Sequence, residues 1–286
     1  MLPAESMTNP ELGKWISSNI ARLQGVTEFP SIEVNSIAAH ALQKSTAWIA
    51  AHQETRLDQN QLALLDKAVD RLIKGEPLSY ITGKRFFYGL ELSVDQRVLI
   101  PRPETELLVE LAIDWIESNP GRNNVADVGT GSGAIAIVLA HRFPTLHITA
   151  IDRLAQALAL AESNAAEHHV AEQIKFKHTD LLDGIDTRFD LILANLPYIP
   201  TQELENLPEL MYEPRYALDG GTDGLEFIRK LINTCEKKLL PKGCMILETQ
   251  YNQDIVVSQI AANQFPLAKI SVHQDLASLP RVAKIQ

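Results

Sequence analysis

The sequence has few cysteines, no long apolar run and no excess of positive charge, and each absence excludes a class of protein. Its 286 residues include only two cysteines, Cys235 and Cys244, whose spacing fits neither a metal site nor a CxxC redox motif. No apolar run approaches the ~20 residues that a membrane-spanning helix needs. The opening MLPAESMTNPEL lacks the basic and apolar regions of a signal peptide. We therefore expect a cytoplasmic protein without disulfides, metal or membrane contact.

Acidic residues outnumber basic ones. The chain has 26 Lys and Arg and 36 Asp and Glu, which gives a formal net charge of −10. Proteins that grip long nucleic acids by their phosphates usually carry a basic face. We therefore expect a protein or small-molecule substrate and no direct nucleic-acid partner. Nothing in the sequence indicates an obligate oligomer, and we expect a monomer.

Residues 1–75 are predicted to form a small helical bundle. Apolar residues recur at three- and four-residue spacing in ELGKWISSNIARL, SIAAHALQKSTAWIAAH and LDQNQLALLDKAVDRLIKG, which is typical of helices with one apolar face. Gly75 and Pro77 then provide a helix stop signal. This region contains no catalytic constellation.

The remaining chain is predicted to contain a hairpin linker (residues 76–100) and an α/β domain (residues 101–286). The linker is rich in aromatic and β-branched residues and is punctuated by Gly83 and Gly89. Helix-length segments then alternate with the candidate strands VADV, HITAID, IKFKHTD, FDLILAN and GCMILET, and the tail adds two short strands. Such alternation predicts a mostly parallel, Rossmann-like sheet with helices on both faces.

A glycine loop lies between the first of these strands and an apolar helix, in VADVGTGSGAIAIVLA. Glycine permits tight turns and close approach of the backbone to a ligand. The predicted cofactor loop consists of Gly129, Thr130, Gly131, Ser132 and Gly133. A plain tight turn is the alternative interpretation, and because the stretch also satisfies G-x-G-x-x-A, a nicotinamide dinucleotide stays open.

Acidic residues at the ends of three successive predicted strands favour S-adenosyl-L-methionine. Asp127 precedes the glycine loop, where a carboxylate can hold the cofactor's ammonium but would repel a pyrophosphate. Asp152 can accept hydrogen bonds from the ribose hydroxyls of either cofactor. Asp180 can accept from the adenine amino group while Leu181 packs on the ring.

The fourth strand ends in Asn195, Leu196, Pro197 and Tyr198, and this tetrad suits methylation of a planar nitrogen. An amide nitrogen is a poor nucleophile because its lone pair is delocalised. A site can accept hydrogen bonds from its N–H groups and aim it at the methyl group. Asn195 and the next backbone carbonyl are candidate acceptors, and Tyr198 offers a flat packing face. An ordinary strand exit is the alternative.

The tetrad resembles the [N/D]PP[Y/F] motif of amino-group methyltransferases. GEPLSYITGKRFFYGLELSVDQRVLIPRPETELLVE and EPRYALDGGTDGLEFI resemble segments of the PrmC/HemK family, which methylates the glutamine of the GGQ motif in class-I peptide-chain release factors. IPRPETE is the most discriminating piece, and the similarity spans roughly residues 75–286. The resemblance implies a class I S-adenosylmethionine-dependent methyltransferase fold, with the helical N-terminus recognising the protein substrate.

The resemblance also implies site residues. The loop from Gly129 to Gly133, Asp152, Leu181 and Asn195 would bind the cofactor, and the whole tetrad would bind the glutamine amide. Four further residues would lie near the active site: Arg102, Pro103, Glu104 and Thr105. A local ion pair that fixes the loop is an equal alternative for Arg102 and Glu104.

Leu196 departs from the family pattern, which usually has proline there. The expected contribution of this position is its backbone carbonyl, which leucine retains, and Pro197 biases Leu196 toward extended conformations. We expect an active enzyme with a slightly looser loop. The alternatives are an adenine amino-group (N6) methyltransferase acting on nucleic acid, which the negative charge disfavours, and a non-catalytic cofactor-binding paralogue, which the intact acids disfavour.

Overall fold

The computed structural model describes residues 9–286, which fall into two compact units, one ending at Gly83 and the other Lys84–Gln286. Residues 76–83, which the sequence assigned to the hairpin linker, belong to the first unit. The reason is a short helix, α5 (Leu78–Thr82), whose Ile81 packs into the core of that unit. Among residues 9–286, no helix is both long and apolar enough to cross a bilayer.

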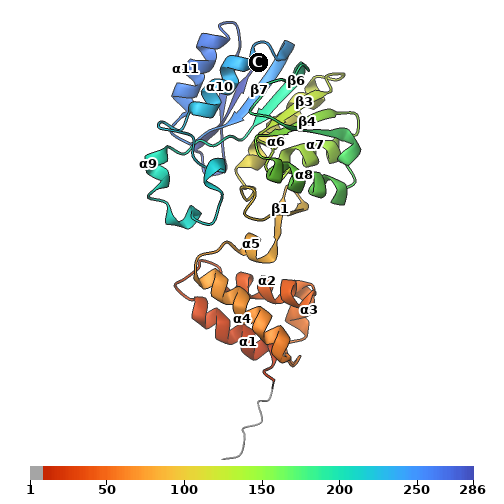
Figure 1. Cartoon of the computed structure of the whole chain (residues 1–286), viewed down its shortest axis with the longest axis vertical. Coiled ribbons are helices and arrows are strands. Elements are labelled where there is room, and N and C mark those ends of the chain that lie inside the picture. Colours follow the sequence, from red (N-terminus) through yellow and green to blue (C-terminus); the bar gives the residue numbers. More distant parts are fainter. Residues whose placement is uncertain (1–8) are drawn as a thin grey trace, which may run out of the picture. The chain divides into compact units, whose positions relative to one another are not determined.

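The first unit is helical, as its apolar periodicity predicts (Figure 1). Besides α5 it contains α1 (Leu12–Leu23), α2 (Pro30–Leu42), α3 (Thr46–Ala51) and α4 (Gln59–Ile73). The second predicted segment forms two helices, because Gln43 adopts a left-handed conformation with φ of 53° and Ser45 caps α3 by accepting a hydrogen bond from the Trp48 backbone. Trp15, Leu65 and Val69 are among the buried residues of this core.

The second unit contains a hairpin and a seven-stranded sheet. The hairpin pairs β1 (Lys84–Phe87) with β2 (Leu90–Ser93), which confirms the predicted hairpin. The sheet contains β3 (Asn124–Val128), β4 (His147–Asp152), β5 (Ile174–His178), β6 (Phe189–Ala194), β7 (Leu239–Glu248), β8 (Ile270–Gln274) and β9 (Pro280–Ile285). Its order is β5-β4-β3-β6-β7-β9-β8, in which the first five strands are parallel and the last two pair antiparallel. The predicted strands and fold class are confirmed.

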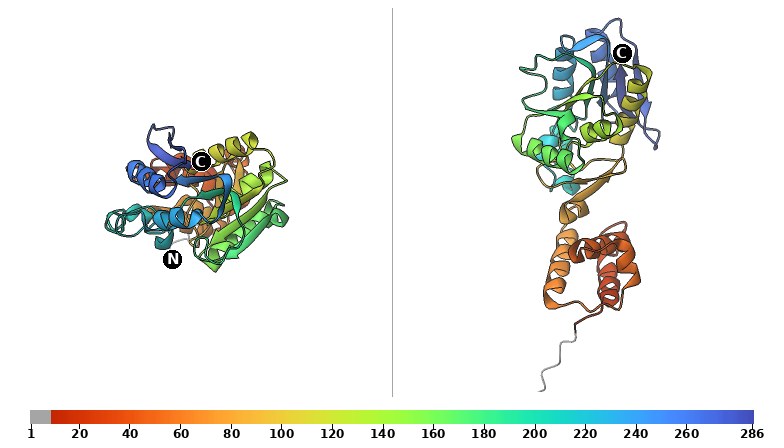
Figure 2. Two further views of the ribbon diagram at one scale, coloured as in Figure 1. Left: turned by 90° about the horizontal axis from the view of Figure 1, so that it is seen from above. Right: turned by 90° about the vertical axis from the view of Figure 1, so that its right-hand side faces the viewer.

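Helices cover both faces of the sheet (Figures 1 and 2). One face packs against α6 (Thr105–Ser118), α7 (Ala134–Arg142) and α8 (Ala155–Glu167), and the other packs against α10 (Glu226–Cys235) and α11 (Asp254–Gln264). The remaining elements are α9 (Thr201–Leu204) and the short 3-10 helices η1 (Ala171–Gln173), η2 (Pro208–Leu210) and η3 (Arg215–Ala217). Two apolar layers therefore bury the central strands, which explains why β6 is buried along its whole length.

The strand order reverses between β3 and β6, because β4 and β5 continue to one side of β3 and β7 lies beyond β6. In open parallel sheets, ligands bind outside the carboxyl ends of the strands at such a switch point. The glycine loop follows β3 and the NLPY tetrad follows β6. The fold therefore places both sequence features at this point.

Candidate active site

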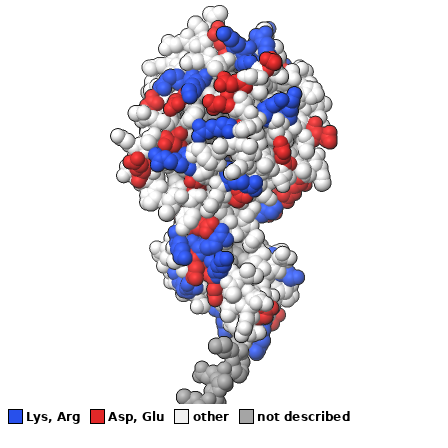
Figure 3. All heavy atoms as spheres, in the orientation of Figure 1, with Lys and Arg blue, Asp and Glu red and all other residues white. Residues whose placement is uncertain are grey.

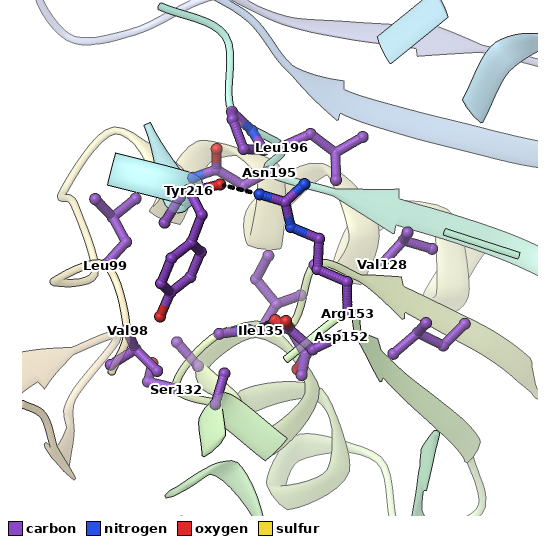
Figure 4. A pocket seen from close by; sticks show the side chains of 18 of the residues that line it. Val98, Leu99, Val128, Ser132, Ile135, Asp152, Arg153, Asn195, Leu196 and Tyr216 are labelled. Atoms are coloured by element: carbon purple, nitrogen blue, oxygen red, sulfur yellow. Dashed lines mark hydrogen bonds between the residues drawn. The ribbon is translucent and has the colours of Figure 1, made fainter. Parts of the chain in front are cut away.

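A pocket opens at this switch point, with a cavity of about 910 Å³ including its mouth (Figure 4). Its walls come from the glycine loop, the ends of β3, β4 and β6, and the segment before α6. The predicted residues that line it are Arg102, Thr105, Gly129, Thr130, Gly131, Ser132, Asp152, Asp180, Leu181, Asn195, Leu196 and Pro197. The structure thus brings together residues from five separate segments of the sequence.

The glycine loop is fixed to the neighbouring strand and to the hairpin. The backbone amides of Gly129 and Thr130 donate to the Ile151 carbonyl at 2.8 and 2.9 Å, which ties the loop to β4. The buried Asn164 side chain donates to the carbonyl oxygens of Ser132 and Ser93. Gly133 does not line the pocket and instead caps α7 with φ of 83°, a conformation that suits glycine.

Asp152 is the last residue of β4, and its side chain is hydrogen-bonded to the glycine loop. Its carboxylate oxygens accept from the backbone amides of Gly131 at 3.0 Å and Leu154 at 2.9 Å. Burial raises the pKa of Asp152, and these backbone hydrogen bonds oppose that rise. The carboxylate is therefore held rigidly at the pocket wall.

Asp127 lies beneath the loop and does not line the pocket. One oxygen, Oδ2, accepts from the Thr130 hydroxyl at 2.7 Å and from the Ala136 amide at 3.2 Å. The other, Oδ1, is buried without a hydrogen-bond partner. Burial raises the pKa of this fully enclosed carboxyl to about 6, although the hydrogen bonds from Thr130 and Ala136 lower it. Asp127 can thus act on a ligand only through the loop or a bridging water.

The first three residues of the tetrad face the pocket, whereas Tyr198 lies outside it. The Asn195 amide nitrogen donates to the Thr105 hydroxyl at 3.0 Å. Leu196 is buried and packs close to Gly129, where an added Cβ would lie 3.0 Å from the Leu196 Cδ2. Tyr198 extends into the core on the α10–α11 face, and its hydroxyl donates to Glu248 at 3.4 Å. Burial, with Glu248 adding to it, raises the pKa of Tyr198.

The IPRPETE segment contributes Arg102 and Thr105 to the pocket, while Pro103 and Glu104 are exposed and lie outside it. Arg102 forms an ion pair with the buried Glu213, whose other oxygen accepts from the Ile100 amide at 3.2 Å. Of the two roles left open for Arg102, the structure shows the ion pair. Its partner is Glu213 rather than Glu104, and it ties this segment to the chain before η3.

Sequence reasoning missed part of the pocket wall, including Arg97, Val98, Leu99, Ile135, Arg153, Tyr216, Ala217 and Phe227. The Arg153 guanidinium lies 4.9 Å from the Phe227 ring centroid and donates to the Tyr216 carbonyl at 3.1 Å (Figure 4). Burial raises the pKa of Tyr216 to about 12. These residues come from five segments of the chain. Tyr216 and Phe227 lie within EPRYALDGGTDGLEFI, and Arg153 directly follows Asp152, which are the signals that could have suggested them.

Comparison with known proteins gives a consistent result. Residues 105–219 match the family model of the methyltransferase small domain, and residues 14–83 match that of the PrmC N-terminal domain. A release factor glutamine methyltransferase of Coxiella burnetii is 36% identical over 94% of this chain and 96% of its own. The chain belongs to the release factor glutamine methyltransferase family. The Haemophilus influenzae member is 35% identical over 86% of this chain and 89% of its own.

The fold agrees with this membership. A ribosomal protein L11 methylase of Lactobacillus delbrueckii subsp. bulgaricus superposes with a TM-score of 0.50 at 25% identity, covering 68% of this chain and 83% of its own. The predicted resemblance, methyltransferase fold and enzyme class are confirmed. In this member of the family, the second residue of the tetrad is Leu196.

Asp127 gives the methyltransferase a distinctive pH dependence of stability. Its folded pKa of about 6 lies above the ordinary 3.8, so the folded state binds the proton more tightly and the wild type loses stability as pH rises through this window. The Asp127→Asn variant lacks this titrating group, so its stability should not show this loss. We therefore expect the difference in unfolding free energy, variant minus wild type, to rise by roughly 3 kcal/mol between about pH 4 and pH 7. Urea unfolding across this range measures it.

An acid with the opposite shift provides the control for Asp127. The hydrogen bond from Arg229 lowers the pKa of Asp223, so its stabilisation is lost as pH falls. For Asp223→Asn, the same difference should change only in the acidic region near and below pH 4. A flat profile for Asp127→Asn would contradict the assigned burial effect.

The ion pair between Arg102 and Glu213 should stabilise the catalytic unit of the methyltransferase. Arg102→Met leaves the Glu213 carboxylate buried without its cation, and Glu213 side-chain exposure is only 2%. We expect the free energy of unfolding to fall by about 3 kcal/mol, since breaking one partner of a buried pair strands a charge.

The exposed pair between Arg142 and Glu117 serves as the matched control, with side-chain exposures of 61% and 51%. Arg142→Met should change stability by less than about 0.5 kcal/mol, because solvent screens such pairs. Equal effects of the two substitutions in chemical denaturation would refute the structural role of Arg102.

Proposed function

We propose that this chain transfers a methyl group from S-adenosyl-L-methionine to the side-chain amide nitrogen of the glutamine in the GGQ motif of class-I peptide-chain release factors. The amide nitrogen gains the methyl group and loses one N–H proton, so S-adenosyl-L-homocysteine and a proton released to solvent are the other products. The modification supports translation termination. The observation that carries the proposal is Asn195 at the pocket wall. Its nitrogen donates to Thr105 at 3.0 Å, which leaves Oδ1 available as an acceptor.

The residues of the pocket fit this cofactor. Asp152 would accept from the ribose hydroxyls, while Asp180 and Leu181 would contact the adenine. The Asp127 carboxylate, with its unpartnered Oδ1, would attract the cofactor's ammonium through the loop or a bridging water, and it would repel a pyrophosphate. Family membership agrees with this choice over a nicotinamide dinucleotide. The bound cofactor supplies an electrophilic methyl group on a sulfonium.

The chain's own contribution to catalysis is orientation. The Asn195 Oδ1 and the Leu196 backbone carbonyl accept hydrogen bonds from the two N–H groups of the substrate amide. These contacts would turn the amide nitrogen toward the cofactor's methyl group, and such orientation supplies several kcal/mol of the barrier. Pro197 completes the wall of this subsite, and Tyr198 supports it from the core.

The first unit would bind the release factor. Its match to the PrmC N-terminal domain covers residues 14–83, and it carries no part of the pocket described above. On the face shown in Figure 3, basic and acidic side chains are interspersed over the catalytic unit rather than separated. This distribution suits a protein substrate better than a nucleic-acid backbone. We infer a monomer that acts in the cytoplasm, where translation takes place.

A methylation assay with mass mapping tests this proposal. The purified chain is incubated with S-adenosyl-L-methionine and a class-I release factor, and the mass of the tryptic peptide containing GGQ is measured by mass spectrometry. We expect a gain of one methyl group on the glutamine, and none on a release factor with that glutamine replaced by alanine. An unmodified peptide from a folded, cofactor-binding enzyme would refute the proposal. Transfer of labelled methyl to DNA or RNA instead would indicate the adenine alternative.

A further inference from the structure

Glu248 is a buried carboxylate beside the pocket that the proposed chemistry does not yet use. It is the last residue of β7 and is 1% exposed. Its Oε2 has no hydrogen-bond partner. Burial raises the pKa of Glu248 to about 7, opposed by hydrogen bonds from Thr105 and Tyr198 and by the charge of Arg281. A group this costly to bury invites a functional explanation.

The sheet register brings Glu248 to the tetrad. Ala194 on β6 is paired with Leu247 on β7, so the next residues, Asn195 and Glu248, leave neighbouring strands at the same edge. Thr105, at the start of α6 and 5% exposed, lies between them. It accepts from the Asn195 nitrogen at 3.0 Å, and its side chain, acting as a hydrogen-bonding group toward Glu248, lowers the pKa of that carboxyl.

The chemistry of these three groups fixes the direction of each hydrogen bond. An ionised carboxylate can only accept, so the Thr105 hydroxyl has to donate its single proton to Glu248. Thr105 can then only accept from Asn195, and the Asn195 side chain has to turn its nitrogen toward Thr105. The amide oxygen is left as the group that the pocket can use.

We propose that Glu248, acting through Thr105, is a positioning residue that holds the Asn195 amide with its oxygen available to the reacting glutamine. This inference rests on the proposed function. Glu248 also accepts from the Tyr198 hydroxyl at 3.4 Å, so a single carboxylate anchors both ends of the tetrad. The orientation of Asn195 is thereby set from outside the pocket.

Glu248→Gln is the decisive substitution because it preserves shape and removes the directionality. A glutamine at 248 can donate its own N–H to Thr105, which frees the threonine proton for the Asn195 oxygen. Asn195 can then rotate and present its nitrogen to the pocket, where a substrate N–H needs an acceptor. We expect kcat to fall about a hundredfold, comparable to losing one oriented polar contact. The Kd for S-adenosyl-L-methionine should change less than about threefold.

Thr105→Val breaks the same relay at its centre with little change of shape. Because both substitutions act on one chain of hydrogen bonds, the double variant should be no more than about threefold slower than the worse single variant. Asp190→Asn is the matched control. Asp190 is buried on β6 and accepts from Arg122 and the Asn124 amide at the start of the neighbouring strand β3, far along β6 from the tetrad. Its substitution should lower stability without lowering kcat.

The pH profile separates positioning from mere stability. The charged groups facing Glu248 are Arg281 from β9, which lowers its pKa, and Glu104 beside α6, which raises it; the uncharged partners are Thr105 and Tyr198. Protonated Glu248 can donate like glutamine, so wild-type kcat at saturating cofactor should fall below about pH 7. Glu248→Gln should lack this limb.

A readout without turnover keeps this inference separate from the proposed function. In isotope-labelled protein, the Asn195 side-chain amide protons should be protected from solvent exchange, and Glu248→Gln and Thr105→Val should remove that protection. Failure of the wild type to methylate release factor would overturn the proposed function alone. Unchanged kcat and unchanged protection in Glu248→Gln would overturn the relay, as would an equal loss of kcat in Asp190→Asn.

Discussion

Asn195→Ala is expected to lower kcat about a thousandfold while the Kd for S-adenosyl-L-methionine changes less than about threefold. The substitution removes the acceptor that orients the substrate nitrogen, and loss of such a contact in a water-poor site costs about 10²–10³ in rate. It also leaves the Thr105 hydroxyl without the hydrogen bond from Asn195 that the structure shows at 3.0 Å. Steady-state methylation of release factor and calorimetric titration with cofactor measure the two quantities.

Asp152→Ala is the contrasting variant for Asn195→Ala. It removes a carboxylate that accepts from the Gly131 and Leu154 amides and that faces the proposed ribose position. We expect this variant to lose cofactor affinity by about a hundredfold. If Asn195→Ala lost affinity to the same extent, its role would be cofactor binding rather than orientation of the substrate.

Gly224→Ala is expected to disable the enzyme from outside the pocket. An added Cβ at Gly224 would collide with the Tyr198 carbonyl oxygen and lie 2.7 Å from the Gln253 Nε2 and 3.1 Å from Pro200. The φ of 72° at this position adds the strain that non-glycine residues experience there. The tetrad would have to move, and a shift of about 1 Å in a positioned group costs about a hundredfold in rate. We expect that loss in kcat and a destabilisation of about 3 kcal/mol.

Gly184→Ala supplies the control for this collision. Gly184 has φ of 63°, similar to Gly224, but an added Cβ would meet nothing within 4 Å. It should therefore show only the backbone strain, about 1 kcal/mol, with kcat unchanged. Thermal unfolding and methylation kinetics on both variants decide the matter. Similar kinetics for the two would mean that the contact with Tyr198 does not hold the tetrad.

The same contacts bear on Leu196, which replaces the usual proline of the family. Proline would restrict this position locally, whereas here the loop is restrained from its surroundings. Gln253 donates to the Tyr198 carbonyl at 2.9 Å, and Ile199 exchanges backbone hydrogen bonds with Leu218 and Gly220. The Leu196 side chain packs against the glycine loop. These tertiary contacts supply stiffness that the sequence suggested was missing.

Most of the site residues predicted from the sequence belong to the glycine loop, the ends of the predicted strands and the NLPY tetrad. Each is signalled locally, by glycine spacing or by a polar residue that ends an apolar strand. Glu248 also ends an apolar strand, but nothing local links either Glu248 or Glu213 to its partner. Thr105 and Arg102 lie more than a hundred residues away from them in the chain. The paired Asn164 and Ser132 are likewise separated by 32 positions.

The sequence by itself determined the fold class, the glycine loop, the tetrad and the family, because hydrophobic periodicity and short motifs are local properties of the chain. Tertiary structure decided that Asp127 and Tyr198 stand outside the pocket, that Arg102 pairs with Glu213, and that the Asn195 amide is held through Thr105. These outcomes depend on strand register and on which buried charges meet. Both arise only when distant segments pack together, so no local pattern encodes them.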